Sequence, residues 1–152
     1  MMLLERDMYL HWCRFNEDTN VVQDIFWTHP NLVKLLNSFN NVLMINNTYK
    51  TNRYMMSLLK VVGVISMGLI FSAAFVLLTS KRENNFVWAF ERLKWLFFRV
   101  DAYPRVVVSD KDISLINAIN IMFPGTFNLP CRFHIDKNVK AKCKMLVHPK
   151  EA

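Results

Sequence analysis

The chain has 152 residues, of which 53% are hydrophobic and 20% are charged. This length suits one domain with one core, and the composition excludes an intrinsically disordered chain. With 3 glycines there is no glycine-rich phosphate-binding loop. The formal net charge of +7 favours an anionic partner, either nucleic acid or an anionic membrane surface, although a basic surface also serves solubility.

The first part of the chain predicts few regular elements. Residues 1–20 are polar and mixed, which indicates an edge element or a linker, and we expect no signal peptide here because charges stand where one needs an apolar run. Pro30 is a favourable first residue for a short helix over residues 31–36. The apolar run from Val42 to Ile45 predicts a buried strand that leads into a loop at Asn46 and Asn47.

A stretch without charges extends from Val61 to Ser80 and has two interpretations. Twenty apolar and small residues in a row are typical of a transmembrane helix. The alternative is a pair of buried antiparallel strands, because the stretch is rich in β-branched residues and Gly68 suits a tight turn near Met67. The residues of this stretch favour the hairpin and leave the membrane span open.

The second half of the chain alternates helical and extended patterns. Apolar residues at helical spacing predict a helix over 83–100, and the β-branched run at 105–109 predicts a strand. Further elements are expected at 112–121 (helix, with Asp112 as N-cap), 127–133 (strand) and 138–147 (basic helix). This order predicts an α/β fold, a mixed sheet flanked by helices.

Two short motifs carry the residues with chemical potential. Asp110 follows a predicted buried strand, a position that suits a metal-binding carboxylate, although Asp110 and Asp112 also suit the role of helix caps. Cys131 and His134 have C-x-x-H spacing, but no second pair matches them and a structural zinc site needs about four ligands. A buried cysteine beside a hydrogen-bonded histidine is the favoured interpretation. The three cysteines are odd in number and widely spaced, which favours a reducing compartment.

Five segments in order resemble the plant Mutator-like (MULE) transposase domain, which is similar to the core of the far-red-impaired-response type of transposase-derived transcription factors. The segments are DIFWTHP (24–30), NNTYKTN (46–52), VGV (62–64), SDKD (109–112) with the AI and FP pairs that follow it, and CRFH (131–134). The resemblance covers roughly residues 20–145. It implies an RNase H-like domain over residues 21–152, preceded by the edge or linker segment 1–20. It also implies the hairpin over residues 61–80 and no membrane span.

The resemblance also implies a DDE catalytic site in which carboxylates hold two Mg²⁺ ions. The first acid position of the family corresponds to Asn46 here, and the second acid corresponds to Asp110. The third acid, a glutamate, lies further downstream in the family, so we expect this chain to be truncated before it. An amide cannot become anionic, and Mg²⁺ prefers carboxylates. We therefore expect Mg²⁺ to be required by the family but not to be held functionally here, with Asp110 as a weak ligand at most.

The sequence thus predicts a truncated or degenerate transposase domain that is catalytically inactive. The alternative is a domesticated, DNA-associated regulatory protein. In both cases we expect weak, sequence-independent DNA binding, nuclear localisation and, as for transposases, a homo-oligomer. The expected DNA contacts are basic side chains near the first motif and at the C-terminal end: Lys50, Arg53, Arg132, Lys137, Lys140, Lys142 and Lys144.

Overall fold

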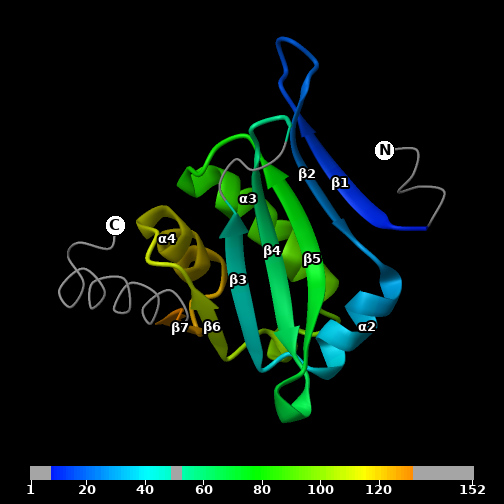
Figure 1. The fold of residues 1–152 in the computed structure, drawn as a ribbon, viewed down its shortest axis with the longest axis vertical. Coiled ribbons are helices and arrows are strands. Elements are labelled where there is room, and N and C mark those ends of the chain that lie inside the picture. Colours follow the sequence, from blue (N-terminus) through cyan, green and yellow to red (C-terminus); the bar gives the residue numbers. More distant parts are fainter. Residues whose placement is uncertain (1–7, 49–52, 132–152) are drawn as a thin grey trace, which may run out of the picture.

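One seven-stranded mixed sheet organises the molecule (Figure 1). The computed structural model describes residues 8–48 and 53–131. The strands lie side by side in the order β1-β2-β5-β4-β3-β6-β7. Their bounds are β1 Leu10–Phe15, β2 Val22–Thr28, β3 Val42–Thr48, β4 Ser57–Val64, β5 Ile70–Leu78, β6 Val106–Ser109 and β7 Phe127–Pro130.

The strands β3, β4 and β5 form an antiparallel meander, and β6 and β7 then add to β3 in parallel. The parallel strands need crossover connections, which the helices α3 (Glu83–Leu96) and α4 (Ile113–Met122) supply. This is the RNase H-like arrangement that the family resemblance implies. The β4–β5 hairpin turns through Ser66–Gly68, as predicted, and no helix of the described residues is long and apolar enough to cross a membrane.

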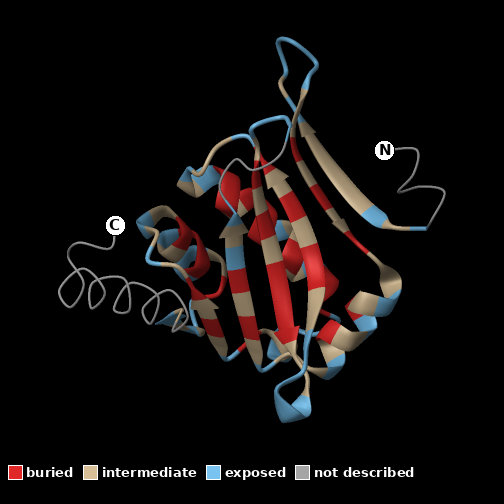
Figure 2. Ribbon diagram, in the orientation of Figure 1, coloured by how far each residue is buried: buried red, intermediate tan, exposed pale blue. Residues whose placement is uncertain are grey.

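The hydrophobic core lies on one face of the sheet. Along β3, Leu43 and Ile45 are buried and alternate with more exposed residues, so they point to the same face. They join Phe86 and Phe90 of α3 and other helix residues in one buried cluster, and Figure 1 shows α3 behind the strands. The remaining described helix, α2 (Pro30–Ser38), contributes Val33 and Leu36 to the same cluster. Figure 2 shows where the buried residues lie in each element.

The opposite face of the sheet is covered by none of the three described helices. Side chains that alternate with the core residues point to it, and most of them are half-buried. Trp27 of β2 stacks on Phe75 of β5 there, with ring centroids 5.5 Å apart. We call this the uncovered face.

Several predicted elements have different bounds in the structure. The helix predicted over 83–100 ends at Leu96, because residues 97–99 are extended or bent, and a short 3-10 turn follows at Val100–Ala102. The first predicted strand extends to Thr48, so Asn46 lies within β3 and not in a loop. The last predicted strand ends at Pro130, and the predicted helix at 138–147 lies outside the described residues. Residues 1–20, expected to form an edge element or a linker, include β1, which is an edge strand of the sheet, whereas β2 was not predicted as a strand.

Candidate nucleic-acid interface at the ends of β3 and β6

The two family acid positions lie next to each other in the sheet. β3 and β6 are parallel, and Ile45 is the partner of Ser109 in their register. The next residues along the two strands are Asn46 and Asp110, so they stand side by side where β6 ends. Ile45 and Ser109 are both buried on the helix-covered face, so strand alternation assigns Asn46 and Asp110 to the uncovered face.

Asp112 has a structural role at the same edge. It is the N-cap of α4, and its Oδ1 accepts hydrogen bonds from the backbone N–H groups of Ser114 (2.9 Å) and Leu115 (3.3 Å). These two donors are among the helix N–H groups that have no partner within the helix. The capping interpretation is therefore confirmed for Asp112, and among the residues that the structure describes Asp110 is the remaining candidate metal-binding carboxylate at this edge.

A lysine lies across the strand from Asn46. In the antiparallel β3–β4 pair the partner of Asn46 is Lys60, and the partner of Lys60 in β5 is Phe75. Both neighbours of Lys60 in the strand, Leu59 and Val61, are buried in the core, so Lys60 points to the uncovered face. Its Nζ lies 5.9 Å from the centroid of the Phe75 ring. Lys60 was not among the predicted site residues, because only the register between β3 and β4 reveals its place beside Asn46.

The residues at this edge do not fit a two-metal site. Asn46 offers a neutral amide, Asp112 is engaged as a helix cap, and a cationic side chain is the cross-strand neighbour of Asn46. Two divalent ions roughly 3.5–4 Å apart need several carboxylates between them. Among the described residues, no group of three or more His, Cys, Asp or Glu side chains is placed to hold a metal ion.

The other predicted site residues fall into two groups. Arg53 is described and exposed, with its guanidinium 6.0 Å from the ring of the exposed Tyr54. Cys131 is a half-buried free cysteine whose backbone N–H donates to the Ser109 carbonyl (2.8 Å), continuing the β6–β7 ladder. The rest lie outside the described residues: Lys50, Arg132, His134, Lys137, Lys140, Lys142 and Lys144. The expectation of a hydrogen-bonded His134 in the C-x-x-H motif therefore stays a prediction.

A second polar region lies on the far side of the sheet, around Asp24 of β2. Asp24 is fully buried, and its carboxylate accepts from the Arg14 guanidinium of β1, whose Nε lies 2.7 Å from Oδ2. It also accepts from the Thr79 N–H (3.1 Å) and from the Asn85 amide (3.4 Å). The Arg14 guanidinium further stacks on Trp88 of α3, 5.3 Å from the ring centroid. This pair fastens the β1–β2 hairpin to α3.

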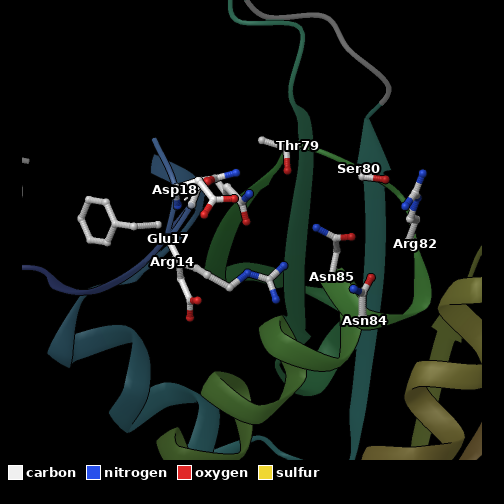
Figure 3. A pocket seen from close by; sticks show the side chains of 11 residues that line it. Arg14, Glu17, Asp18, Thr79, Ser80, Arg82, Asn84 and Asn85 are labelled. Atoms are coloured by element: carbon white, nitrogen blue, oxygen red, sulfur yellow. Dashed lines mark hydrogen bonds between the residues drawn. The ribbon is translucent and has the colours of Figure 1, made fainter. Parts of the chain in front are cut away.

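A polar cavity of about 560 Å³ opens beside the Arg14–Asp24 pair (Figure 3). Arg14 projects into it from β1, Asn84 and Asn85 line it from α3, and Thr79 and Ser80 line it from the loop after β5. Glu17 and Asp18 close it from the tip of the β1–β2 hairpin. Cations and carboxylates are mixed in this lining, so it selects neither anions nor cations.

Three buried amide atoms of Asn47 in β3 and Asn128 in β7 have no hydrogen-bond partner among the described residues. Both amide atoms of Asn47 and the Nδ2 atom of Asn128 are buried without a partner. The Oδ1 atom of Asn128 accepts from the Ser109 hydroxyl at 2.9 Å. Burial raises the pKa of the Cys13 thiol in β1.

Comparisons with known proteins find similar sequences in Arabidopsis thaliana. The chain is 31% identical over 139 residues to the protein FAR1-related sequence 5 of Arabidopsis thaliana. This alignment covers 88% of this chain and 17% of the Arabidopsis protein. The Arabidopsis putative protein FAR1-related sequence 10 is 25% identical over 133 residues, 88% of this chain and 19% of the relative. The chain thus spans less than a fifth of the length of these two relatives.

Among solved structures, the catalytic core domain of HTLV-2 integrase in complex with magnesium matches with a TM-score of 0.40 and 11% identity, over 75% of this chain and 77% of the integrase chain. A family model with the description "MULE transposase domain" matches residues 42–138 of this chain. The matched residues extend from the first residue of β3 past the end of β7. This match covers more than half of the chain and includes both Asn46 and Asp110. The chain belongs to the MULE transposase domain family.

Proposed function

We propose that this MULE domain binds DNA and does not catalyse strand cleavage or transfer. The observation that carries the proposal is the pair of neighbours at the ends of β3 and β6, Asn46 and Asp110. The family position for the first acid holds an amide, so the described part of this edge has one candidate carboxylate where paired metal ions would need several. A formal net charge of +7 supports an anionic partner.

The DNA binding proposed here is weak, independent of sequence and sensitive to salt. Lysine and arginine side chains that neutralise phosphates release counterions, and this release makes affinity fall as salt increases. Arg53, which lies near the end of β3, is the described member of the expected contact set. Strong preference for one DNA sequence, or binding that ignores salt, would contradict this part of the proposal.

A plasmid-nicking assay tests the catalytic part. We expect no Mg²⁺- or Mn²⁺-dependent nicking of supercoiled DNA by the wild-type chain or by Asn46→Asp. The new carboxylate in Asn46→Asp faces Lys60 across the strand pair and forms an ion pair with it. Loss of one catalytic electrostatic group costs on the order of a hundredfold or more. Metal-dependent nicking by the wild type that disappears in Asp110→Ala would overturn the proposal.

A second candidate function is that of a domesticated regulatory protein that associates with DNA in the nucleus, as a homo-oligomer. The matches to two FAR1-related proteins over 88% of the chain favour it. A fluorescent fusion of the chain tests the location directly, and sedimentation tests the oligomeric state. Exclusion of the fusion from the nucleus would remove this candidate.

A further inference from the structure

We infer that the uncovered face binds a single strand of nucleic acid, with Lys60 holding a backbone phosphate without a divalent metal ion. This inference rests on the proposed DNA binding and names the surface that performs it. The starting observation is a row of side chains that crosses four neighbouring strands. Register pairs Trp27 with Phe75, Phe75 with Lys60, and Lys60 with Asn46.

All four members of this row point away from the core. The residues next to them along their own strands include Phe26, Val76 and Leu59, which are fully buried in the core. Because successive side chains of a strand alternate between faces, the row itself points to the uncovered face. Adjacent strands lie about 4.8 Å apart, so the row extends over about 14 Å. The uncovered face is therefore a platform with aromatic rings at one end and polar groups at the other.

The Lys60 ammonium is the only cation in this row, and it forms no ion pair with the described residues. It lies near the Phe75 ring, whose electron-rich face attracts a cation and holds it in the middle of the platform. Asp110 stands one strand beyond Asn46, so an uncharged amide separates the ammonium from the carboxylate of β6. The centre of the platform thus presents a positive charge to a ligand.

The combination of a fixed cation with adjoining aromatic surface selects a ligand that carries both an anion and flat apolar groups. Single-stranded nucleic acid has this chemistry, because its bases are free to contact aromatic rings while its phosphates reach a lysine. A duplex presents mainly phosphates and sugars on its outside and leaves the Trp27–Phe75 surface without an apolar partner. Lys60 is the cross-strand neighbour of Asn46, the position at which the family resemblance implies a metal-binding acid, so the protein itself supplies a positive charge for phosphate at this place.

Fluorescence anisotropy of the full chain with a labelled single-stranded oligonucleotide tests this inference. We expect Lys60→Met to weaken binding severalfold and to reduce the slope of log affinity against log salt by about 0.7, the value for one phosphate contact on a single strand. Lys60→Arg should retain the wild-type slope. Lys34→Met is the matched control, since Lys34 is an exposed lysine on α2, away from this face, and should change neither quantity. Replacing Mg²⁺ by EDTA should leave wild-type binding unchanged.

Tryptophan fluorescence locates the strand on the molecule. Trp27 lies on the uncovered face, whereas Trp95 is an exposed residue of α3 on the opposite side. Added oligonucleotide should quench the wild-type chain and the Trp95→Phe variant, and it should quench Trp27→Phe much less. Inorganic phosphate alone should not quench.

The outcomes separate this inference from the proposed function. If the chain binds DNA but Lys60→Met matches the wild type, or if binding requires Mg²⁺, the face is wrongly assigned while DNA binding stands. Quenching that follows Trp95 leads to the same conclusion. If the chain binds no DNA of either form, both proposals fail, and concentration-dependent self-association would then identify a second copy of the chain as the occupant of the face.

Discussion

Asp24 and Asp110 illustrate two kinds of polar region in one sheet. Asp24 is fully buried and has partners in three parts of the chain: Arg14 of β1, Thr79 in the loop after β5 and Asn85 of α3. Asp110 is part-exposed at the end of β6, beside the amide of Asn46. The first region is assembled to hold the fold together, and the second faces outward from the strand ends. A carboxylate's partners and burial, more than its position after a strand, indicate its role.

The largest expected effect separates these regions by stability. Arg14→Met should lower the free energy of unfolding by about 3–5 kcal/mol, because it leaves the Asp24 carboxylate buried without its cation. Methionine keeps much of the packing against Trp88, so the loss reports mainly the charge. Urea unfolding followed by circular dichroism measures the difference.

A double variant controls for this effect. Arg14→Met with Asp24→Leu removes both charges and should recover most of the lost stability, because apolar replacements of a buried pair are often neutral or stabilising. If Arg14→Met alone unfolds with the wild-type midpoint, the pair does not fasten the hairpin to α3. The Asp24 region would then not differ from the Asp110 region by stabilising the fold.

A smaller effect is expected at the helix cap beside Asp110. Asp112→Ala should lower the free energy of unfolding by about 1 kcal/mol, because two N–H groups of α4 lose their acceptor. Asp112→Asn is the matched control and should retain most of the stability, since asparagine caps helices about as well. Equal losses in both variants would show that the negative charge at Asp112, and not the cap, stabilises this edge.

Sequence patterns were sufficient for the elements whose residues carry a periodic signal. The Val61–Ser80 hairpin and the α4 cap were predicted because a β-branched run, a glycine and an N-cap aspartate act locally. The β1–β2 hairpin was missed, since Arg14 and Asp24 are polar residues that become buried only through each other. Lys60 was missed for a related reason: its place beside Asn46 depends on register between strands and leaves no signal in the local sequence.

The smallest expected effect has the opposite sign and concerns Asn47. This residue alternates with the exposed Asn46 on β3 and points to the helix-covered face, where both of its amide atoms are buried without a hydrogen-bond partner. A buried polar group without a partner costs about 1–3 kcal/mol. Valine is apolar, favours strands and has a volume similar to that of asparagine. We therefore expect Asn47→Val to raise the free energy of unfolding by about 1 kcal/mol.

Asn46→Val is the matched control for this prediction, because it makes the same change one residue earlier on the uncovered face. Its effect should stay within about 0.5 kcal/mol, as for most surface substitutions. A rise in the urea midpoint for Asn47→Val with an unchanged slope would show that the strand end keeps a polar residue at a cost to stability. A fall would mean that the Asn47 amide is satisfied in solution. In that case the ends of β3 and β6 would resemble the Asp24 region, with polar groups that support the fold, and the contrast between the two regions would rest on Asn46 and Asp110 alone.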